Sequence, residues 1–523
     1  MNLQSTRFII ALLYFATSAA AQKISFAPVE YKGKTLLEIL KSSDNELYVV
    51  KHDWSGADGD WEYEGTLQQL DFDLKIKQEY DVKKLRKDLD IQVNKSSFVI
   101  NNKLSCVQYA KYGDHSKMKY SLVNIASIDN SPAIIQTTCI DTLQPGHYTN
   151  SGLFALPSQV SNDQKYLLIG GVSNGSNPHY LLLNDKLQVI DLNIPIENDN
   201  GEDDNSVSTS MMLFGHYLVI ENKALYKSQW HWDWGSEINF GNERRNKMML
   251  SYSVIDILNP HLKKINIPSF DEIKAVSSSK IYNESTEELT IAGFTLGNSE
   301  KVRNTIMSGF YSYTVDLKTA EISDRVTMEA DETVYHQFET IRKDKGDKQK
   351  ISKALKMDDG STLFVIECFT PSQTVLTGGS QMQHTTYPPI YNNIYITSFD
   401  KSGKFQWINK IERREKIKGI KPGFFSSAKF TNYGSSIIYA AKDNVHILFN
   451  DDKKVYDYNV LKDGTMTNKT LNEDDKDELV IFPQGIDLIY KALVTPKSLE
   501  QIGNNLFIPC LHNDKVTVMK ITY

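Results

Sequence analysis

One short stretch of sequence decides how this chain folds: Ser398-Phe399-Asp400-Lys401-Ser402-Gly403-Lys404-Phe405-Gln406-Trp407. Its polar centre has aromatic residues on both sides, a pattern typical of two strands joined by a tight turn. Asp400 is placed to accept hydrogen bonds from backbone amides within the turn, and Gly403 can take a positive φ. Trp407 is expected to pack between neighbouring sheets. The stretch therefore predicts a β-hairpin that supplies a large ring to a sheet interface.

The same order of strand, polar turn and strand recurs along the chain, for example over Leu67–Val82, Tyr180–Ile194 and Val455–Leu471. Several of these hairpins follow another strand-like segment, so the repeating unit contains about four strands. About eight units occur at spacings of roughly 50 to 80 residues, the size of a propeller blade with variable loops. We therefore predict an all-β fold, a single β-propeller of four-stranded blades, with eight blades and seven as the alternative.

Pairing of the first and last strands would close such a ring and remove its exposed strand edges. We expect Lys23–Val29 to pair with the C-terminal strands around Val516–Ile521, so that residues 22–523 form one domain. An array of β-sandwiches is the main rival, but it needs linkers between its domains. The most linker-like stretch, Glu197–Ser208, falls inside a unit.

Helical patterns are scarce in this sequence. Short amphipathic stretches occur at Leu36–Lys41, Val82–Leu89 and Ile351–Met357, and the charged run Arg342–Lys353 is expected to be a solvated loop or a surface helix. The alternation of strands and helices that a parallel sheet requires is absent, which disfavours α/β folds.

The D-x-x-G-x-x-x-W pattern of Asp400–Trp407 is similar to turns in propeller repeats. Together with Asp358–Ser361 upstream and Val445–Asp451 downstream, it resembles an uncharacterised group of secreted bacterial β-propeller proteins, most clearly over residues 358–451. The resemblance implies the fold and implies no activity. The pattern also departs from the sialidase Asp-box, S-x-D-x-G-x-T-W, by an extra residue before the glycine and a longer gap to the tryptophan.

The N-terminus has the three parts of a secretory signal peptide. Met1–Arg7 carries one positive side chain, Phe8–Ala16 is almost wholly apolar, and Thr17–Ala21 ends in three alanines. The apolar run is much shorter than the roughly 20 residues that a membrane-spanning helix needs. We expect residues 1–21 to be removed before Gln22, which places the mature chain in the periplasm, at the cell surface or in the medium.

Charge and hydropathy narrow the range of partners. The chain has 58 Lys and Arg against 65 Asp and Glu, a net charge of −7, which has the wrong sign for binding a phosphate backbone. No stretch of the mature chain is long and apolar enough to cross a bilayer. We therefore expect no nucleic acid and no transmembrane segment, and a protein or glycan of the cell envelope as partner.

The four cysteines are too few for a disulfide framework in a chain of 523 residues. Cys106 and Cys139 lie in strand-like segments close enough in sequence to share one sheet, and Cys368 and Cys510 lie in similar apolar strands. Three pairings are open, and buried free thiols are the other interpretation. No C-x-x-C motif or mixed Cys/His cluster occurs, so no structural zinc site is predicted.

No catalytic motif agrees with its sequence context. Gly171–Gly175 matches the G-x-S-x-G nucleophile elbow, but Pro178 and a strand follow where a helix should begin, so a glycine-rich hairpin loop is expected instead. The eleven histidines include no H-E-x-x-H pair, so catalytic zinc is unsupported. Carboxylates such as Asp400 or Glu412 could form a glycosidase pair, although the sequence does not identify which carboxylates meet.

Two acidic loops are candidates for calcium, because hard oxygen ligands suit that ion. They are Asp53–Glu62, through Asp58-Gly59-Asp60, and Glu197–Asp204. Neither fits the spacing of an EF-hand loop, and solvated acidic loops are the alternative. No other metal or cofactor is predicted.

The most unusual segment is Trp230-His231-Trp232-Asp233-Trp234, which holds half of the six tryptophans. In an extended chain its rings lie on one face, where they would suit stacking on sugar rings or anchoring a partner protein. The alternative is that they pack over a blade edge or cap the propeller. We take Trp230, Trp232 and Trp234, with His231 and Asp233 as polar contacts, as the candidate ligand-binding residues.

The absence of a catalytic motif that agrees with its sequence context, together with this one aromatic segment, favours a secreted or cell-surface binding or scaffold protein over an enzyme. A carbohydrate-active hydrolase or lyase, with a carboxylate pair in the propeller mouth, is the alternative.

Overall fold

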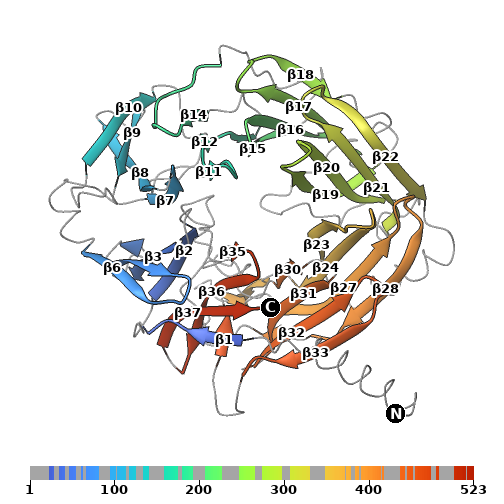
Figure 1. Cartoon of the computed structure of the whole chain (residues 1–523). Helices are drawn as coiled ribbons and strands as arrows, with labels where there is room; N and C mark the ends of the chain where they lie inside the picture. The colour runs from blue at the N-terminus through green and yellow to red at the C-terminus, as the bar shows by residue number, and fades with distance from the viewer. Residues whose placement is uncertain are drawn as a thin grey trace, which may run out of the picture.

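Antiparallel sheets arranged in a ring make up this protein in the computed structural model (Figure 1). The structure describes residues 23–28, 35–41, 46–54, 61–62, 66–81, 95–101, 103–112, 117–124, 133–140, 158–174, 180–192, 206–226, 247–265, 274–296, 307–329, 348–370, 373–377, 383–387, 390–413, 415–416, 436–441, 444–451, 454–472, 479–481, 500–513 and 515–523. Throughout these ranges the regular secondary structure consists of strands.

Within these ranges, seven sheets have four or five strands, and we number them as blades 1 to 7. Blades 1 and 2 contain β2 (Thr35–Lys41), β3 (Glu46–Trp54), β4 (Trp61–Glu62), β5 (Thr66–Asp71) and β6 (Ile76–Asp81), then β7 (Lys95–Ile100), β8 (Lys103–Tyr112), β9 (Lys117–Asn124) and β10 (Ala133–Ile140). Blades 3 and 4 contain β13 (Val172–Asn174), β15 (Ser206–Phe214), β16 (Tyr217–Tyr226), β17 (Lys247–Asp256) and β18 (Leu262–Ile265), then β19 (Lys274–Asn283), β20 (Glu288–Leu296), β21 (Met307–Asp316) and β22 (Glu321–Glu329).

Blade 5 contains β23 (Lys348–Lys356), β24 (Thr362–Thr370), β27 (Ile390–Phe399), β28 (Phe405–Ile411) and β29 (Glu415–Lys416). Blade 6 contains β30 (Ile437–Ala441), β31 (Asn444–Asp451), β32 (Lys454–Leu461) and β33 (Met466–Thr470). Blade 7 contains β34 (Leu479–Ile481), β35 (Glu500–Ile502), β36 (Asn505–His512), β37 (Lys515–Thr522) and the N-terminal β1 (Lys23–Phe26). In blades 1, 2, 4, 5 and 6 the first strand along the chain lies toward the centre of the ring and the strand at the other end of the four-stranded path lies toward its rim, whereas in blade 7 the N-terminal β1 lies at the rim (Figure 1).

The structure corrects the predicted blade count from eight to seven, the stated alternative. The extra unit was the hairpin expected over Tyr180–Ile194. In the structure, β11 (Ser158–Val160), β12 (Tyr166–Gly170) and β14 (Tyr180–Asn184) form a sheet of three strands between blades 2 and 3 (Figure 1). After β14 the described chain folds back on it, with one isolated bridge between Leu183 and Val189 and a hydrogen bond from the Ile190 amide to the Leu182 carbonyl at 2.9 Å.

The predicted closure of the ring is confirmed. β1 pairs antiparallel with β37, with Lys23 opposite Thr522 and Phe26 opposite Met519. The Ala27 amide continues the pairing by donating to the Val518 carbonyl at 2.8 Å. The N-terminal strand therefore completes the last blade and covers an edge that would otherwise be exposed.

The core lies between neighbouring blades. Most inner strands are buried on both faces because a sheet stands on either side of them; in β31, six consecutive residues from Val445 to Asn450 are buried. One cluster joins blades 5 and 6 through residues such as Val365, Ile396 and Ile447. Another joins blade 6 to blade 7 around Leu448 and Ile508. The stability of each blade therefore depends on its neighbours.

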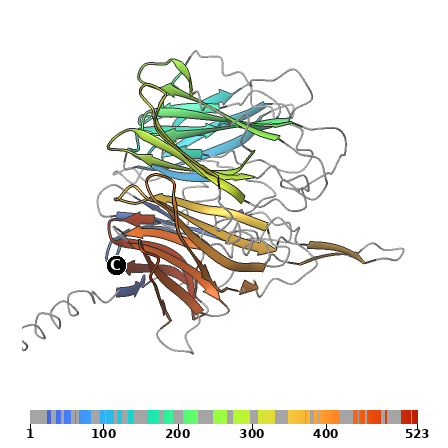
Figure 2. The ribbon, with the colours of Figure 1, turned by 90° about the vertical axis from the view of Figure 1, so that its right-hand side faces the viewer.

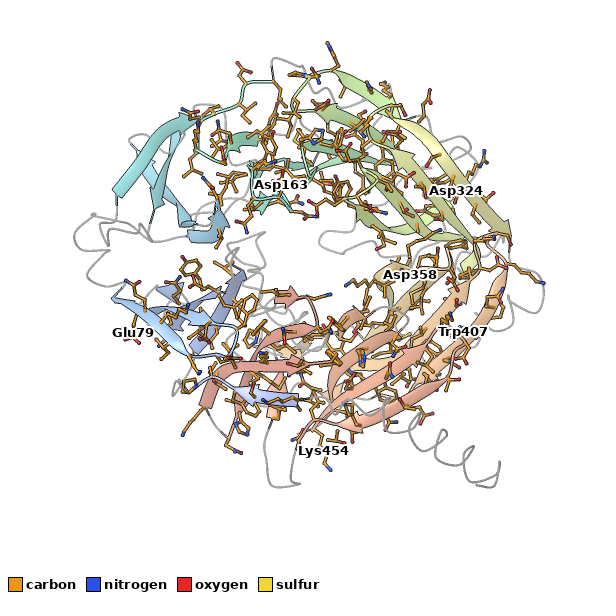
Figure 3. The ribbon with its side chains drawn as sticks, in the orientation of Figure 1. Glu79, Asp163, Asp324, Asp358, Trp407 and Lys454 are labelled. Atoms are coloured by element: carbon orange, nitrogen blue, oxygen red, sulfur yellow. The ribbon has the colours of Figure 1, made fainter. Side chains whose placement is uncertain are left out.

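The turn within Ser398–Trp407 forms as predicted. Asp400 Oδ1 accepts hydrogen bonds from the Ser402 amide at 2.8 Å, the Ser402 hydroxyl at 2.6 Å and the Lys404 amide at 2.9 Å. Gly403 has a φ of 81°. Trp407 packs against the cluster between blades 5 and 6, and its Nε1 donates to the Lys462 carbonyl at 3.0 Å (Figure 3).

The same five-residue turn also forms at two places that have leucine instead of glycine at the position of Gly403. Asp71 and Asn184 each accept from the amides two and four residues ahead, as Asp400 does. The left-handed position is occupied there by Leu74, with φ 64°, and Leu187, with φ 59°. Both leucines are buried, so packing offsets the cost of a positive φ that glycine avoids.

The weak helical predictions are wrong where the structure describes them. Leu36–Lys41 belongs to β2, and Ile351–Lys356 belongs to β23, as does the end of the charged run Arg342–Lys353. Both are first strands of a blade, where pairing with the next strand and burial between sheets override a short amphipathic pattern. Val82–Leu89 lies outside the described residues. No helix in the described ranges has the length and apolarity to span a membrane.

Alternating strand direction gives blades 3 to 6 two distinct faces; in blade 3 the four strands counted here are β15 to β18, and β13 pairs with β15 at the edge of that sheet. The connections from the first to the second strand, and from the third to the fourth, leave on one side, which we call the turn face. The connections from the second to the third strand, and onward to the next blade, leave on the other, which we call the loop face. A separate two-stranded sheet, β25 (Gln373–Thr377) with β26 (Gln383–Tyr387), lies between β24 and β27 and projects from the loop face (Figure 2).

Candidate functional site

Three buried clusters of polar side chains lie where blades meet, and their hydrogen bonding distinguishes them. The first joins blades 5 and 6. Glu367 Oε1 on β24 accepts from the Ser436 amide at 2.6 Å, the Ser436 hydroxyl at 2.7 Å and Arg413 Nη1 at 3.5 Å. Its other carboxylate oxygen accepts from the Ser352 hydroxyl.

The Arg413 guanidinium lies between two rings, 5.2 Å from the centre of Tyr391 and 5.0 Å from that of Phe449. The side chains of Arg413 and Glu367 are 0% and 2% exposed, so neither can reach a ligand in this conformation. A buried carboxylate with its charge balanced and its oxygens occupied is a clamp between blades rather than an acid or base for catalysis.

The second cluster joins blades 3 and 4 in the same way. Glu221 on β16 accepts from the Tyr252 hydroxyl at 2.7 Å and forms an ion pair with Lys280 of β19. Glu221 is buried, and its charge is balanced by a cation from the neighbouring blade. We assign this cluster the same structural role.

The third cluster, on blade 6, contains a histidine held by an aspartate. His446 Nδ1 lies 3.0 Å from Asp457 Oδ1 and 3.2 Å from Oδ2. The Asp457 side chain is 1% exposed and that of His446 is 11% exposed. Since a carboxylate can only accept, this contact places a proton on Nδ1 of His446. Within the described part of the chain, Nε2 makes no hydrogen bond.

Aromatic rings from two blades enclose this histidine. Tyr523, which follows β37, lies 4.1 Å from the His446 ring, and Tyr439 of β30 stacks on Tyr523 at 4.7 Å. The Tyr439 hydroxyl donates to the Gly503 carbonyl at 3.2 Å, and burial raises the pKa of Tyr439. The rings fix the imidazole plane, so the histidine is preorganised.

An asparagine lies beside the histidine on the same sheet face. Asn459 stands directly opposite His446 in the β31–β32 pair, and residues in such positions point to one side of the sheet. Asn459 Oδ1 is buried and finds no hydrogen-bond donor among the described residues. Two polar atoms with no hydrogen-bond partner among the described residues, His446 Nε2 and Asn459 Oδ1, thus occur in one cross-strand pair. We take His446, Asp457 and Asn459 as the candidate site that the structure provides.

The binding residues predicted from the sequence are not those of the histidine site. Trp230, His231, Trp232, Asp233 and Trp234 lie outside the described residues, between the paired strand ends Tyr226 and Lys247. Trp54 and Trp61, which lie within the acidic stretch Asp53–Glu62, are cross-strand partners in β3 and β4.

The carboxylates named as a glycosidase pair do not meet. Asp400 lies in the turn before β28, and Glu412 follows its last residue. At about 3.3 Å per residue the seven-residue strand separates them by about 20 Å, far beyond the roughly 5 to 9.5 Å between glycosidase carboxylates. Asp400 caps its turn, and the Glu412 side chain is 86% exposed.

Ser173 of the G-x-S-x-G match lies in β13, which pairs with β15, and not at a turn into a helix. The segment is thus a strand of blade 3 rather than the predicted hairpin loop. Gly170 and Gly171, both with positive φ, carry the chain from β12 into it.

Cys368 and Cys510 are buried and neither forms a disulfide, as one interpretation predicted. Burial raises the pKa of Cys510, which makes it unreactive as a nucleophile. Cys106 and Cys139 lie on β8 and β10 of blade 2, so the expectation that they share a sheet is confirmed.

The acidic loops proposed for calcium fall largely outside the described residues, which include only Asp53, Trp54, Trp61 and Glu62 of the first and none of the second. Among the described side chains no group of three His, Cys, Asp or Glu residues could hold a metal ion.

Sequence reasoning missed the histidine site, although its signal was present. His446 interrupts the apolar strand Val445–Phe449, and Asp457 interrupts the alternating strand that follows. Predicting the β31–β32 hairpin with its register would have placed them on one face. The contribution of Tyr523 depends on the contact between blades 6 and 7, for which the sequence holds no local signal.

No family model and no curated protein matches this sequence. Among solved structures, the chain is similar to a polysaccharide lyase of family PL25, an ulvan lyase, at 9% identity and a TM-score of 0.39 over 95% of both chains. It is similar to the Dos1 propeller at 9% identity and a TM-score of 0.42 over 94% of both chains. It also matches dipeptidyl peptidase 4 of Porphyromonas gingivalis at 8% identity and a TM-score of 0.42, over 93% of this chain and 60% of that one. At these identities and TM-scores no activity transfers to this chain.

Proposed function

We propose that this chain is a secreted or cell-surface binding or scaffold protein that presents partner-binding loops on a rigid β-propeller. Release of the signal peptide before Gln22 and a protein or glycan partner of the cell envelope belong to this proposal. The observation that carries it is the arrangement of the loop face. Strand ends of successive blades are held together there by buried clamps such as Glu367–Arg413, so loops that start from them have fixed bases.

The segment with three tryptophans supports the choice of a binding role. It begins after Tyr226 and ends before Lys247, which are paired residues at the loop-face end of β16 and β17. Tryptophan is enriched among residues that dominate binding energy, and stacking on one ring contributes about 1 to 3 kcal/mol. A segment with this many aromatic rings suits a glycan or a protein partner.

Trp232→Ala tests the proposal. The chain from Gln22, with and without this substitution, is applied to an array of cell-envelope glycans and to a cell-envelope extract, and its thermal unfolding is measured. We expect unchanged unfolding and lost binding. The control is Trp407→Ala, which removes a ring packed between blades 5 and 6 and should lower Tm while binding of the folded protein remains.

Two outcomes would overturn this function. A large drop in Tm for Trp232→Ala, with binding retained, would make the segment part of the core. Turnover of glycans or esters, abolished by changing one carboxylate, would replace binding by carbohydrate-active hydrolysis or elimination.

A further inference from the structure

One two-stranded sheet of this protein belongs to no blade. Among the described strands β25 and β26 pair only with each other, and Figure 2 shows their hairpin reaching out beyond the loop face. An isolated two-stranded hairpin is only marginally stable in water, and three or more strands are needed for a sheet that is stable by itself. A further strand that pairs with one edge of this hairpin would therefore stabilise it.

The rims of the blades are protected against such pairing. The strands at six of the seven described rims carry a lysine or an arginine: Lys23 of β1, Lys77 of β6, Lys263 of β18, Arg325 of β22, Lys410 of β28 and Lys469 of β33. β10, at the seventh rim, has no charged residue but is irregular between Ile134 and Gln136. Charged side chains and bulges both prevent an edge strand from pairing with another chain.

The hairpin has neither kind of protection. From Pro371 to Pro389 the sequence contains no Asp, Glu, Lys or Arg, in a chain of which 24% is charged. The pairing of β25 with β26 runs without a register shift. Six of the ten strand residues are Thr, Val or Tyr, which favour strands. The hairpin thus presents regular, uncharged strand edges.

The lack of charge also selects the partner. An antiparallel strand can pair with an identical strand about a two-fold axis, which gives a self-complementary contact. A strand of an unlike protein carries a charged residue at about one position in four, and this edge offers it no counter-charge. The same strand of a second copy brings no charge. Two hairpins joined in this way form one sheet of four strands.

Of the two edges, β25 is the better suited to this contact. It contains Val375 and Leu376, the two aliphatic residues of the hairpin strands, whereas β26 contains none. Cross-strand pairs of β-branched residues stabilise antiparallel strands. Pairing about Val375, the middle residue of β25, places Val375 opposite itself and Gln373 opposite Thr377 of the second copy.

We propose that this hairpin is a dimerisation arm, in which β25 of two copies pairs antiparallel about Val375 to form one four-stranded sheet between two propellers. The arm makes the contact away from the two propellers, which repel each other because each has a negative net charge. Edges of five residues bury little surface, so we expect a reversible dimer with a Kd on the order of micromolar. This inference goes beyond the binding function proposed above and does not depend on it.

Sedimentation of the chain that begins at Gln22, over a range of micromolar concentrations, tests the proposal. We expect an equilibrium between monomer and dimer. Val375→Lys places two like charges directly opposite each other, so it should weaken dimerisation by about tenfold or more, equivalent to about 1.4 kcal/mol.

Thr385→Lys is the matched control, because Thr385 is the cross-strand partner of Val375 and the substitution adds the same charge to the same hairpin. In the proposed sheet the two copies of residue 385 are three strand spacings apart, about 14 Å, which exceeds the Debye length of about 8 Å at physiological salt. This variant should dimerise as the wild type does. Thermal unfolding shows whether each variant is folded.

Val375→Cys tests the register of the contact. Residues directly opposite each other in an antiparallel pair have Cα atoms about 4.5 to 5.5 Å apart, a separation that suits a disulfide. Mild oxidation should therefore link two copies of Val375→Cys faster than two copies of Thr385→Cys, and the wild type measures the background from the four native cysteines.

Two results would overturn the proposal. A chain that stays monomeric at all these concentrations would leave the hairpin to a strand of an unlike protein. Dimers that Val375→Lys and Thr385→Lys weaken equally would have their contact elsewhere. Because Trp232 takes no part in the arm, either result leaves the loop-face proposal unaffected, and a failure of Trp232→Ala to lose binding leaves the arm unaffected.

Discussion

At the scale of single residues, polar side chains in this protein have two kinds of role. Asp400 organises a turn at the surface, and Glu367 and Arg413 join two blades in the interior. Both roles satisfy backbone or charged groups that would otherwise be unpaired. The two roles differ in their desolvation free energy, because only the interior pair, Glu367 and Arg413, has been removed from water.

Asp400→Ala should destabilise the protein by about 1 kcal/mol at neutral pH, because the turn amides lose their acceptor. The hydrogen bond from the Ser402 hydroxyl is the main cause that lowers the pKa of Asp400 below its ordinary value of 3.8. A lowered pKa gives stability that is present above the unfolded value and lost as the pH falls through the folded value. Denaturant unfolding of both proteins from pH 7 to pH 3 should show the difference shrink below about pH 4. A difference independent of pH would contradict this.

Glu367→Ala should cost about 3 to 5 kcal/mol, because it leaves the Arg413 charge buried without its carboxylate. The measurement is the free energy of unfolding in urea. Glu412→Ala is the matched control: Glu412 lies 3.7 Å from Lys410 but is exposed, so its removal should cost less than about 1 kcal/mol. Equal effects of the two substitutions would argue against the clamp.

At the scale of elements, blades contact one another through their turns as well as their strands. Gly464, in the β32–β33 turn of blade 6, has a φ of 88°, and a Cβ there would lie 2.9 Å from the Trp407 ring of blade 5. Asn409 of β28 donates to the Gly464 carbonyl at 2.6 Å. The absence of a side chain at Gly464 thus permits the β32–β33 turn of blade 6 to lie against strand β28 of blade 5.

Gly464→Ala should lower stability by at least about 1 kcal/mol more than Gly503→Ala. Both glycines have positive φ, so both substitutions strain the backbone, but a Cβ at Gly503 would meet nothing within 4 Å. Thermal unfolding of the two variants isolates the contact with Trp407. If Gly503→Ala were as damaging as Gly464→Ala, backbone strain alone would explain the loss.

At the scale of the whole molecule, stability depends on closing the ring. β1 covers the edge of β37, Phe26 stacks on His512 at 4.1 Å, and the Thr517 hydroxyl donates to the Ala27 carbonyl at 3.2 Å. These contacts join residues almost 500 positions apart in sequence. The last blade is therefore incomplete until the N-terminal strand arrives.

A chain that begins at residue 29 should unfold at a lower temperature than one that begins at residue 22, and it should associate at high concentration through the exposed edge of β37. Differential scanning calorimetry and light scattering measure the two effects. The chain from residue 22 is the control, since it lacks only the predicted signal peptide. Identical unfolding of both chains would show that closure does not stabilise the propeller.

Local pattern was sufficient to predict the class of fold, the four-stranded blade, the Asp400 turn and the pairing of β1 with β37. Each follows from period-two alternation, from the conformations open to aspartate and glycine, or from the need to cover a strand edge. Where local pattern was weak, as at Leu36–Lys41 and Ile351–Lys356, burial between two sheets decided the conformation, and the helical prediction was wrong.

The sequence by itself determined that this chain forms β-hairpins along its length. Turn residues and the alternation of apolar and polar residues act over only a few positions, so their effect can be predicted locally. Only the tertiary structure decided that, among the described residues, seven sheets and not eight have four or more strands, and which polar residues meet. Glu367 finds Ser436, and His446 finds Tyr523, across contacts between blades. Such contacts join residues distant in sequence through the packing of whole sheets. Neither strand carries a periodic sequence pattern that would predict a contact of this kind.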